Sequence, residues 1–363
     1  AAALDDADLR PLELAPPADL DAGMASDATP SGATPSDAPA SDASASDAPD
    51  GSASASADAA PSGSPLAPFR VERPLARERA PVFTHTENVL VLGLDRRGRR
   101  RWGRADSILL VVFDPETEHV GVVSIPRDLY VHVPGHGAAR INATLNIAER
   151  LGLDPLETMR GVVSETLALP IAHLVALDLA AFAQIVDDVG GVEVEVPCAI
   201  RDNFIDPEAP GGRRLLDVPA GQVLMDGATA AMYARSRHGR SDWSRARRQQ
   251  AIVFGVRARL GGGRGLLRAT AIVETLDRSI RSDMTRLEML QLIGRGLEVR
   301  ADRIHGLVLN HRVVTRHRTT DGKHVLLPDL PAIDAALVGL FAQPAPGTLP
   351  ARSRCRPIDA ALN

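Results

Sequence analysis

Short apolar runs alternate along this chain with longer segments in which apolar residues recur at helical spacing. The short runs are rich in branched residues and predict buried strands over 88–94, 107–113, 119–125, 174–177 and 192–196. The longer segments predict helices over 142–151, 155–167, 179–189, 226–234, 244–260, 266–276 and 287–297. Because strands and helices interleave, the pattern predicts an α/β domain in which helices cover both faces of a central sheet.

Two polar interruptions locate element boundaries independently of the apolar pattern. Residues 114–118 (Asp-Pro-Glu-Thr-Glu) have turn chemistry, so the strand at 119–125 should return beside the strand at 107–113. The pair Gly190-Gly191 follows the amphipathic segment 179–189, and glycine is the residue that most readily ends a helix.

The first 70 residues differ in composition from the rest of the chain. Residues 15–68 consist mainly of Ala, Ser, Asp, Pro and Gly, which offer little apolar surface to offset the entropy of ordering. Residues 1–70 hold twelve acids and two arginines, a charge of −10; subtracting it from the whole-chain −5 leaves +5 for residues 71–363. We therefore expect a disordered acidic linker at 1–70 and one domain at 71–363.

Several classes of protein are excluded by what the chain lacks. No run of about 18 apolar residues is present, so the chain as given contains no transmembrane helix. Because the chain starts with Ala1 rather than Met, we expect an N-terminal targeting or anchoring segment upstream of it. Its two cysteines, Cys198 and Cys355, exclude a cysteine-based zinc site and a disulfide-dense scaffold. A Cys198–Cys355 disulfide in an oxidising compartment and two separate thiols both remain open.

Four segments combine acids with arginines at the ends of predicted strands: 93–97, 104–107, 124–128 and 235–250. The last is the densest, with six arginines in sixteen residues. An arginine guanidinium grips phosphate oxygens with two parallel hydrogen bonds and keeps its charge, whereas paired aspartates suit Mg²⁺ together with phosphate oxygens. Gly93 permits a close backbone approach at the first turn. The combination favours a pyrophosphate site built for phosphoryl transfer.

The charged residues allow three other interpretations. Arginines on helices commonly form solvated faces with weak surface ion pairs, and Arg99–Arg101 fit an exposed basic loop. His238 is either a base or a hydrogen-bonded neighbour of the arginines. Nucleic acid is disfavoured as a partner, because the body carries only +5 and lacks interleaved aromatic residues.

In their order and their amino-acid content, the motifs of residues 88–260 resemble those of the LytR-CpsA-Psr family of cell-wall glycopolymer ligases. The resemblance rests on Gly93/Asp95/Arg97, 104–107, 124–128, 140–143, 186–197, 221–227 and 235–250. It implies a three-layer α/β/α domain with a central mixed sheet. It also implies an apolar tunnel for a prenyl chain, which we expect to be lined by aliphatic residues between 144 and 190.

The resemblance also implies an activity. Such enzymes act in the cell envelope, at the extracytoplasmic face of the cytoplasmic membrane. They take a glycan linked to polyprenyl pyrophosphate, transfer it with its proximal phosphate to a peptidoglycan hydroxyl, and release polyprenyl phosphate. The expected partners are therefore the lipid-linked glycan donor, the peptidoglycan acceptor and the membrane.

Carried over residue by residue, the family pattern places Mg²⁺ on Asp95 and Asp106. It assigns the pyrophosphate to Arg104, Arg127, Arg235, Arg237, Arg245 and Gln249. Arg97 and Arg140 fall at matching positions in the head-group region, and Asp128 or Asp242 is expected to take the hydroxyl proton or to orient an arginine.

The chain departs from the family pattern in several places. Arg140 stands where lysine is common, residues 96–102 are unusually rich in arginine, and the usual N-terminal membrane helix is replaced by the acidic segment. Residues 262–363 match only loosely.

Two alternatives to a ligase stay open at the level of sequence. Water in place of the sugar hydroxyl would make the protein a polyprenyl-pyrophosphate phosphatase. A non-catalytic carrier or envelope regulator would bind the same lipid pyrophosphate without turnover dependent on Mg²⁺. The retained aspartate and arginine set favours an active enzyme, and no helix-turn-helix pattern supports a transcriptional regulator.

Overall fold

The computed structural model describes residue 83 and residues 85–95, 102–206, 209–236, 242–261 and 265–345. The predicted linker at 1–70, most of the arginine-rich loop at 96–102, His238 and Cys355 lie outside the described residues. Cys198 is disulfide-bonded. Within the described part of the chain, no helix combines the length and apolar character needed to cross a bilayer.

A six-stranded mixed sheet forms the centre of the domain, in the order β11-β6-β1-β2-β3-β12. Its strands are β1 (Glu87–Asp95), β2 (Arg104–Asp114), β3 (His119–Ser124), β6 (His173–Asp178), β11 (Ile280–Ser282) and β12 (Ile304–Val308). The β1–β6 and β3–β12 pairs are parallel and the other pairs are antiparallel. The predicted return of β3 beside β2 is confirmed, as is the mixed sheet.

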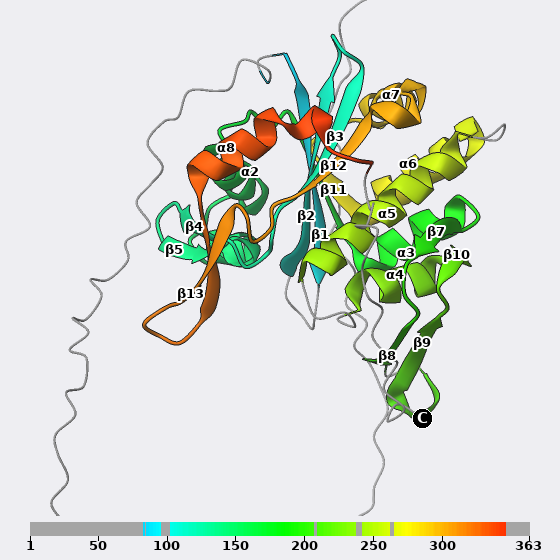
Figure 1. Cartoon of the computed structure of the whole chain (residues 1–363), viewed down its shortest axis with the longest axis horizontal. Coiled ribbons are helices and arrows are strands. Elements are labelled where there is room, and N and C mark those ends of the chain that lie inside the picture. The colour runs from blue at the N-terminus through cyan, green and yellow to red at the C-terminus, as the bar shows by residue number, and fades with distance from the viewer. Residues whose placement is uncertain are drawn as a thin grey trace, which may run out of the picture. The chain divides into compact units, whose positions relative to one another are not determined.

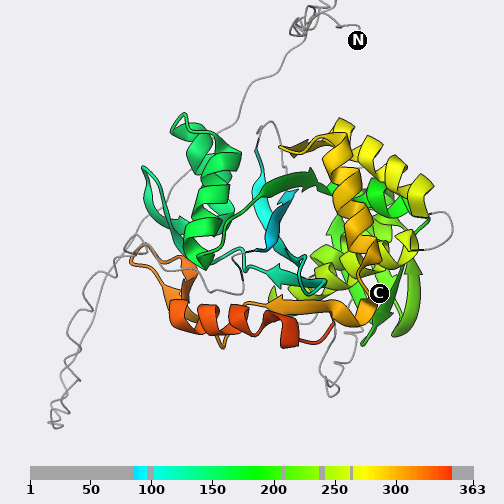
Figure 2. The same cartoon turned by 90° about the horizontal axis from the view of Figure 1, so that it is seen from above.

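Helices cover both faces of this sheet, which confirms the three-layer α/β/α prediction (Figures 1 and 2). One face packs against α1 (Thr144–Arg150), α2 (Pro155–Leu167) and α8 (Leu330–Val338). The other faces α3 (Leu179–Asp188), α5 (Asp242–Leu260), α6 (Gly265–Ser279) and α7 (Arg286–Glu298), with α4 (Gly227–Arg235) against α3 and α5.

The alternation of side chains along β1 explains why its sequence is almost continuously apolar. Leu90, Leu92 and Leu94 join the core beneath α1, α2 and α8, whereas Val89 and Val91 join the core beneath α3 and α7. A strand with helices on both faces has no side that needs polar residues.

Four two-stranded sheets surround this centre. Their pairs are β4 (Tyr130–Val133) with β5 (Gly137–Arg140), β7 (Val192–Val196) with β10 (Gly221–Met225), β8 (Ile200–Ile205) with β9 (Arg213–Val218), and β13 (Val314–Arg318) with β14 (His324–Pro328). Of these eight strands, the apolar pattern predicted β7 alone, which alternates buried and exposed residues rather than joining the central sheet.

The end of the β1–β2 pair is shaped by a close contact and a bulge. A Cβ atom at Gly93 would lie 2.9 Å from the Cβ of Ser107, so only glycine fits there without a shift. The register slips between Gly93 and Leu94, after which Asp95 faces Arg104. The bulge thus changes the direction in which the Asp95 side chain points. Bulges commonly redirect side chains in this way beside active sites.

Candidate active site

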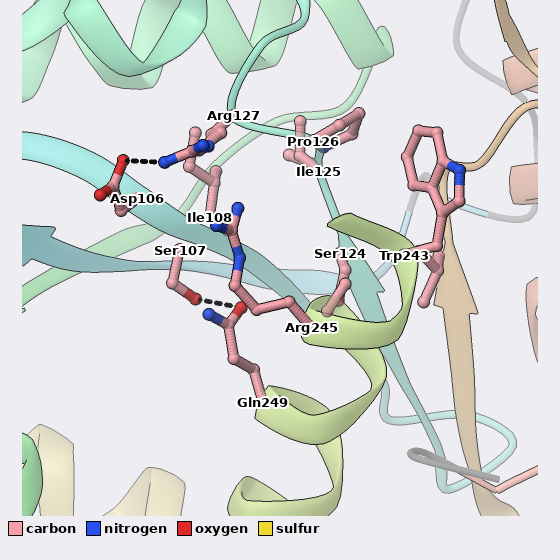
Figure 3. Close-up of a pocket in the computed structure, with 12 residues that line it drawn as sticks. Asp106, Ser107, Ile108, Ser124, Ile125, Pro126, Arg127, Trp243, Arg245 and Gln249 are labelled. Atoms are coloured by element: carbon pink, nitrogen blue, oxygen red, sulfur yellow. Dashed lines mark hydrogen bonds and ion pairs between the residues drawn. The ribbon is translucent and has the colours of Figure 1, made fainter. Parts of the chain in front are cut away.

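A polar cavity lies where β2, the end of β3 and the first turns of α5 meet (Figure 3). Its polar and aromatic lining consists of Asp106, Ser107, Ser124, Arg127, Trp243, Arg245 and Gln249. Residues far apart in sequence meet here, because Ser107 and Gln249 are 142 positions apart and form a hydrogen bond. Three of the four segments singled out by sequence therefore converge on one place.

A row of alternating acids and arginines leads away from this cavity, starting at its lining residues Asp106 and Arg127. Arg127 Nη1 donates to Asp106 Oδ1 over 3.1 Å, and Arg127 Nε lies 3.6 Å from Asp128 Oδ2. Arg140 Nε lies 3.5 Å from the other oxygen of Asp128. The side chains are between 17% and 32% exposed, so they are ordered by their neighbours while a ligand can still reach them.

Backbone hydrogen bonds fix the segment that carries Arg127. The carbonyl oxygen of Arg127 accepts from Asn142 N at 3.2 Å. The carbonyl oxygens of the next two residues accept from Leu326 N at 2.9 Å and from Ile141 N at 2.8 Å, respectively. The segment after β3 is therefore held from two other elements, which places the guanidinium before any ligand arrives.

Helix α5 presents different faces to the site and to the core. Arg245 and Gln249 are four residues apart and share the face toward β2, where Gln249 Oε1 accepts from Ser107 Oγ over 3.0 Å. Gln250 instead points into the core, where its Nε2 lies 2.8–3.0 Å from Val122 O, Ser124 Oγ and Leu307 O and shares its two hydrogens among them. The adjacent glutamines thus serve different purposes, which the sequence did not distinguish.

Arg248 also lies on α5, but its contacts hold two helices together. Its Nε donates to Tyr233 O over 3.0 Å, its Nη2 donates to Ser236 O, and its guanidinium lies over the Tyr233 ring. Burial lowers the pKa of Arg248, against an opposing effect of Tyr233. Arg248 therefore ties α5 to α4 rather than facing the cavity.

Arg235 enters the site from the end of α4. The helix begins at the N-cap Asp226, whose Oδ1 accepts from Thr229 N over 2.8 Å; hydrogen bonds from Thr229 lower the pKa of Asp226. At the other end, the Arg235 guanidinium lies 5.5 Å from the centre of the Phe204 ring. This cation–π contact with the β8–β9 hairpin restricts where Arg235 can point.

An apolar cavity of about 340 Å³ adjoins the polar one and shares Asp106, Ser107 and Gln249 with it. Its polar end includes Asp95, Asp178 and Arg235. Its apolar walls come from β1, β2, β6, α3, α5, α6 and α7, with lining residues Val91, Leu109, Val175, Leu177, Leu179, Phe182, Ile185, Val253, Val256, Leu260, Ile272 and Ile293. A second apolar cavity of about 260 Å³ shares Val253, Val256, Leu260 and Ile293 with it.

The expectation that residues 144–190 line the tunnel is only partly right. Residues from β6 and α3 do so, but no residue of α1 or α2 lines either apolar cavity, in a region that the structure describes fully. The reason is topological, because α1 and α2 pack on the opposite face of the sheet. Sequence could not separate the two faces, since helices on both of them present an apolar side to the sheet.

Asp95 and Asp106 both line the apolar cavity at its polar end. Among the described residues, no cluster of three or more potential metal ligands is found. Two carboxylates fit Mg²⁺, which usually takes one or two protein carboxylates together with phosphate oxygens and water. They would not fit a metal that needs a complete protein cage.

The predicted residues fall into three groups in the structure. Asp95, Asp106, Arg127, Arg235, Arg245 and Gln249 line the two joined cavities. Asp128 and Arg140 flank Arg127, and Arg104 is exposed at the start of β2. Arg97, Arg237 and the side chain of Asp242 lie outside what the structure describes.

Four cavity residues were missed by the sequence reasoning: Ser107, Ser124, Asp178 and Trp243. Ser107, Ser124 and Trp243 occur within segments that the sequence analysis singled out for their charged residues, and this position was the available signal. Asp178 was hidden by its role as N-cap of α3, where it accepts from Ala181 N over 3.0 Å.

Comparison with known proteins identifies a family match. Residues 70–337 match the model of the LytR_cpsA_psr family. The teichoic acid transferase TagU of Halalkalibacterium halodurans is 27% identical over 248 residues, covering 63% of this chain and 76% of that protein. TagU of Enterococcus faecalis is 31% identical over 173 residues, covering 47% of this chain and 52% of the relative. The printed name of both is polyisoprenyl-teichoic acid–peptidoglycan teichoic acid transferase.

Solved structures share the fold. The crystal structure of Bacillus subtilis TagV aligns with a TM-score of 0.58 at 23% identity, covering 70% of this chain and 95% of that chain. A structure of TagT bound to LI-WTA aligns with a TM-score of 0.54 at 20% identity, covering 74% of this chain and 95% of that one.

Proposed function

The chain belongs to the LytR_cpsA_psr family, and on that premise we propose that it transfers a phosphoglycan from a polyprenyl-pyrophosphate donor to a peptidoglycan hydroxyl. One structural observation supports the proposal in addition to family membership. A cluster of arginines and aspartates opens directly onto an apolar cavity, and the two spaces share Asp106, Ser107 and Gln249. Such a junction suits a ligand with a charged centre and a long apolar tail.

The apolar cavity would bind the prenyl chain. Each methylene group removed from water contributes about 0.8 kcal/mol, so even part of a prenyl chain provides substantial affinity. Binding energy from this remote part of the substrate can hold the pyrophosphate in position for the reaction.

The polar cavity would bind the pyrophosphate. Arg127 and Arg245 line it, and Arg235 lines the polar end of the adjoining apolar cavity. Asp95 and Asp106 would hold Mg²⁺, which when bound supplies positive charge against the pyrophosphate oxygens. Gln249 accepts from Ser107 through its amide oxygen, and its amide nitrogen donates to Ala234 O over 3.4 Å, so its second amide hydrogen is the one that would serve a ligand at the junction.

In the proposed reaction, the acceptor hydroxyl oxygen attacks the phosphorus nearer the glycan. A new phosphorus–oxygen bond forms, the bond from that phosphorus to the bridging oxygen breaks, and polyprenyl phosphate leaves with the bonding electron pair. The arginines offset negative charge on the phosphoryl oxygens as it redistributes in the transition state.

The hydroxyl proton must pass to a base. Each oxygen of Asp128 is already near an arginine, Oδ2 near Arg127 and Oδ1 near Arg140. This arrangement favours Asp128 as the residue that orients both arginines. Asp242, the first residue of α5, is our proposed proton acceptor.

This activity belongs to the cell envelope, because its donor is a membrane lipid and its acceptor is the wall. We place the site at the extracytoplasmic face of the cytoplasmic membrane. Acceptor choice between a sugar hydroxyl and water decides between ligase and phosphatase.

A binding experiment tests the joined cavities before any turnover is measured. The full chain is titrated with polyprenyl pyrophosphate, the matching polyprenol, and inorganic pyrophosphate, each with and without Mg²⁺. The proposal expects the complete amphiphile to bind more tightly than either fragment by at least about 100-fold, because both cavities contribute at once. Equal binding of polyprenol and polyprenyl pyrophosphate would contradict it.

A further inference from the structure

The β8–β9 hairpin exposes apolar side chains on one of its two faces. Ile205 is 81% exposed, the largest fraction among the large apolar side chains that the structure describes, and Leu215 is 43% exposed. In the register of the hairpin, Ile205 lies opposite Arg213 and Leu215 lies opposite Asn203. Ile205 and Leu215 are therefore diagonal neighbours, about 7–8 Å apart. We call the face that carries Ile205, Leu215 and Arg213 the outer face.

The inner face of the hairpin is packed and held in place. Ile200, Leu216 and Val218 are at most 6% exposed and belong to the same core cluster as residues of α4. Asp202 Oδ2 accepts a hydrogen bond from Ser236 Oγ over 2.7 Å, which ties the hairpin to the end of α4. Because alternate residues of a strand point to opposite faces, this packing keeps the side chains of the outer face in solvent.

The hairpin lies beside the polar end of the apolar cavity. The ring of Phe204, on the inner face, has its centre 5.5 Å from the guanidinium of Arg235, and Arg235 lines that cavity. Figure 1 shows the hairpin projecting from the rest of the domain at the bottom of the view, below α4 and the β7–β10 pair. A surface that met the outer face would therefore lie near the place where the charged and lipid parts of the proposed donor meet.

The charges of the hairpin are nearly balanced. Residues 200–218 carry three arginines and four acids. Arg201 lies 3.6 Å from Asp217 and Arg214 lies 2.9 Å from Asp206, whereas no carboxylate of a described residue forms an ion pair with Arg213. An arginine beside aliphatic residues suits the boundary of a bilayer, because its charge can reach lipid phosphate while its stem lies against apolar chains. A contact made by this face would be mainly apolar.

We propose that the outer face of the β8–β9 hairpin contacts the lipid bilayer and inserts Ile205 and Leu215 into its surface. This inference rests on the proposed function, whose donor is a membrane lipid, and it names the surface through which the site meets the membrane. The contact would hold Arg235 and the polar end of the apolar cavity near the lipid phosphates. The prenyl chain could then pass from the bilayer into the cavity over a short path, and the reaction itself is unchanged.

A second copy of the chain fits this face less well than a bilayer does. Stable interfaces between proteins bury about 1,200–2,000 Å² between surfaces of matching shape, far more than two side chains can supply. A bilayer receives apolar side chains without a complementary surface, and its acyl boundary lies just beneath the headgroups. The two aliphatic side chains of the outer face are therefore better suited to lipid.

Flotation of the full chain with phospholipid vesicles tests the proposal. The vesicles contain either phosphatidylcholine alone or equal parts of phosphatidylcholine and phosphatidylglycerol. The hairpin variant is Ile205→Ser/Leu215→Ser. The matched control, Leu153→Ser/Val338→Ser, removes two aliphatic side chains that are 41% and 56% exposed on α8 and on the turn between α1 and α2. Circular dichroism checks that both variants are folded.

The wild-type protein and the control should bind both kinds of vesicle alike, and the hairpin variant should bind them about 10-fold more weakly. This difference should persist at high salt, because salt screens charges and not apolar contacts. Equal binding of the hairpin variant and the wild-type protein would overturn the proposal, as would a difference that disappears at high salt. A wild-type dimer in sedimentation equilibrium that the hairpin substitutions dissociate, without any effect on vesicle binding, would assign the outer face to a second copy instead.

A soluble donor separates failure of this inference from failure of the proposed function. The wild-type protein and the hairpin variant should transfer oligosaccharide at equal rates from a short-chain, water-soluble polyprenyl-pyrophosphate donor. With a long-chain donor embedded in vesicles, the hairpin variant should be several-fold slower. Transfer from the short donor without any difference in vesicle binding would retain the function and reject the hairpin contact. A difference in vesicle binding without transfer from either donor would retain the contact and reject the function.

Discussion

Ser107 Oγ donates a hydrogen bond to Gln249 Oε1 over 3.0 Å, joining the second strand of the sheet to the long helix α5. Both residues line both the polar and the apolar cavity. The bond therefore lies where the charged and apolar parts of the proposed donor would meet.

The adjacent glutamines of α5 provide a matched pair of variants. Gln249→Ala should lower the transfer rate with little effect on stability, because its side chain faces the cavities. Gln250→Ala should lower the free energy of unfolding by about 1–3 kcal/mol, since Gln250 is 2% exposed and its two amide hydrogens serve three buried acceptors. Urea denaturation and transfer assays of both variants measure this, and the reverse pattern would refute the assignment.

Arg127 should be the most sensitive arginine of the polar cavity. It contacts Asp106 directly and its backbone is held by Asn142. Arg127→Ala should lower kcat/KM by about 100-fold or more, the usual cost of removing a preorganised donor from a developing charge. Arg127→Lys should recover little, because lysine cannot grip phosphate with two parallel hydrogen bonds. Full transfer activity of a normally folded Arg127→Ala protein would exclude the role.

Filling the apolar cavity should discriminate among donors by the length of their lipid. Val253 is 37% exposed because it lines this space, although it lies on α5 between apolar neighbours. Val253→Trp should raise KM about 10-fold for a long polyprenyl donor and less for a short one, through the loss of several buried methylene contacts. Val338→Trp on α8, at a position 56% exposed and outside both cavities, is the control. An equal effect on both donors would argue against lipid in the cavity.

A stacked histidine pair predicts how stability depends on pH. His119 Nδ1 and His305 Nε2 are 2.7 Å apart, and His305 Nδ1 is 2.7 Å from Gln343 O. Because the carbonyl can only accept, His305 donates to it, and His119 donates to His305. Burial, His305 and Arg303 lower the pKa of His119 from 6.5, partly opposed by Asp114 and Asp302.

A lowered histidine pKa means that protonation favours the unfolded chain. Stability should be complete above pH 6.5 and should decline as the pH falls below it, until His119 is protonated in the folded state as well. Urea denaturation between pH 5 and 7.5 should show a smaller decline for His119→Gln than for the wild-type protein. An unchanged pH dependence would place the titration at other groups.

The sequence predicted the fold well wherever apolar periodicity is strong. The predicted helix at 155–167 coincides with α2, and the predicted strand at 88–94 lies within β1, because both elements bury most of one or both faces. The short hairpins were missed because they are polar and half-exposed. Strand β13, for example, reads Val-Thr-Arg-His-Arg and buries only its first residue.

The sequence predicted which residues form the site better than it predicted where they lie in the fold. Arg127 and Asp106 were recognised from motifs that precede or follow strands, and they meet because β2 and β3 are neighbours in the sheet. The face of the central sheet on which a lipid would lie depends on which helices cover that face. The placement of the helices follows from the crossover connections of the chain, which the apolar pattern does not encode. For the same reason, the link from Arg140 to His324 could not be anticipated across 184 positions.

Reconstituted transfer tests the central claim most directly. The full chain is incubated with a polyprenyl-pyrophosphate-linked oligosaccharide and a peptidoglycan oligomer, with Mg²⁺ or EDTA, and the products are analysed by mass spectrometry. We predict a product in which one phosphate joins the oligosaccharide to peptidoglycan, formed together with polyprenyl phosphate and lost in EDTA. Release of polyprenyl phosphate with only free oligosaccharide phosphate, in the presence of a competent acceptor, would contradict the account and identify a phosphatase.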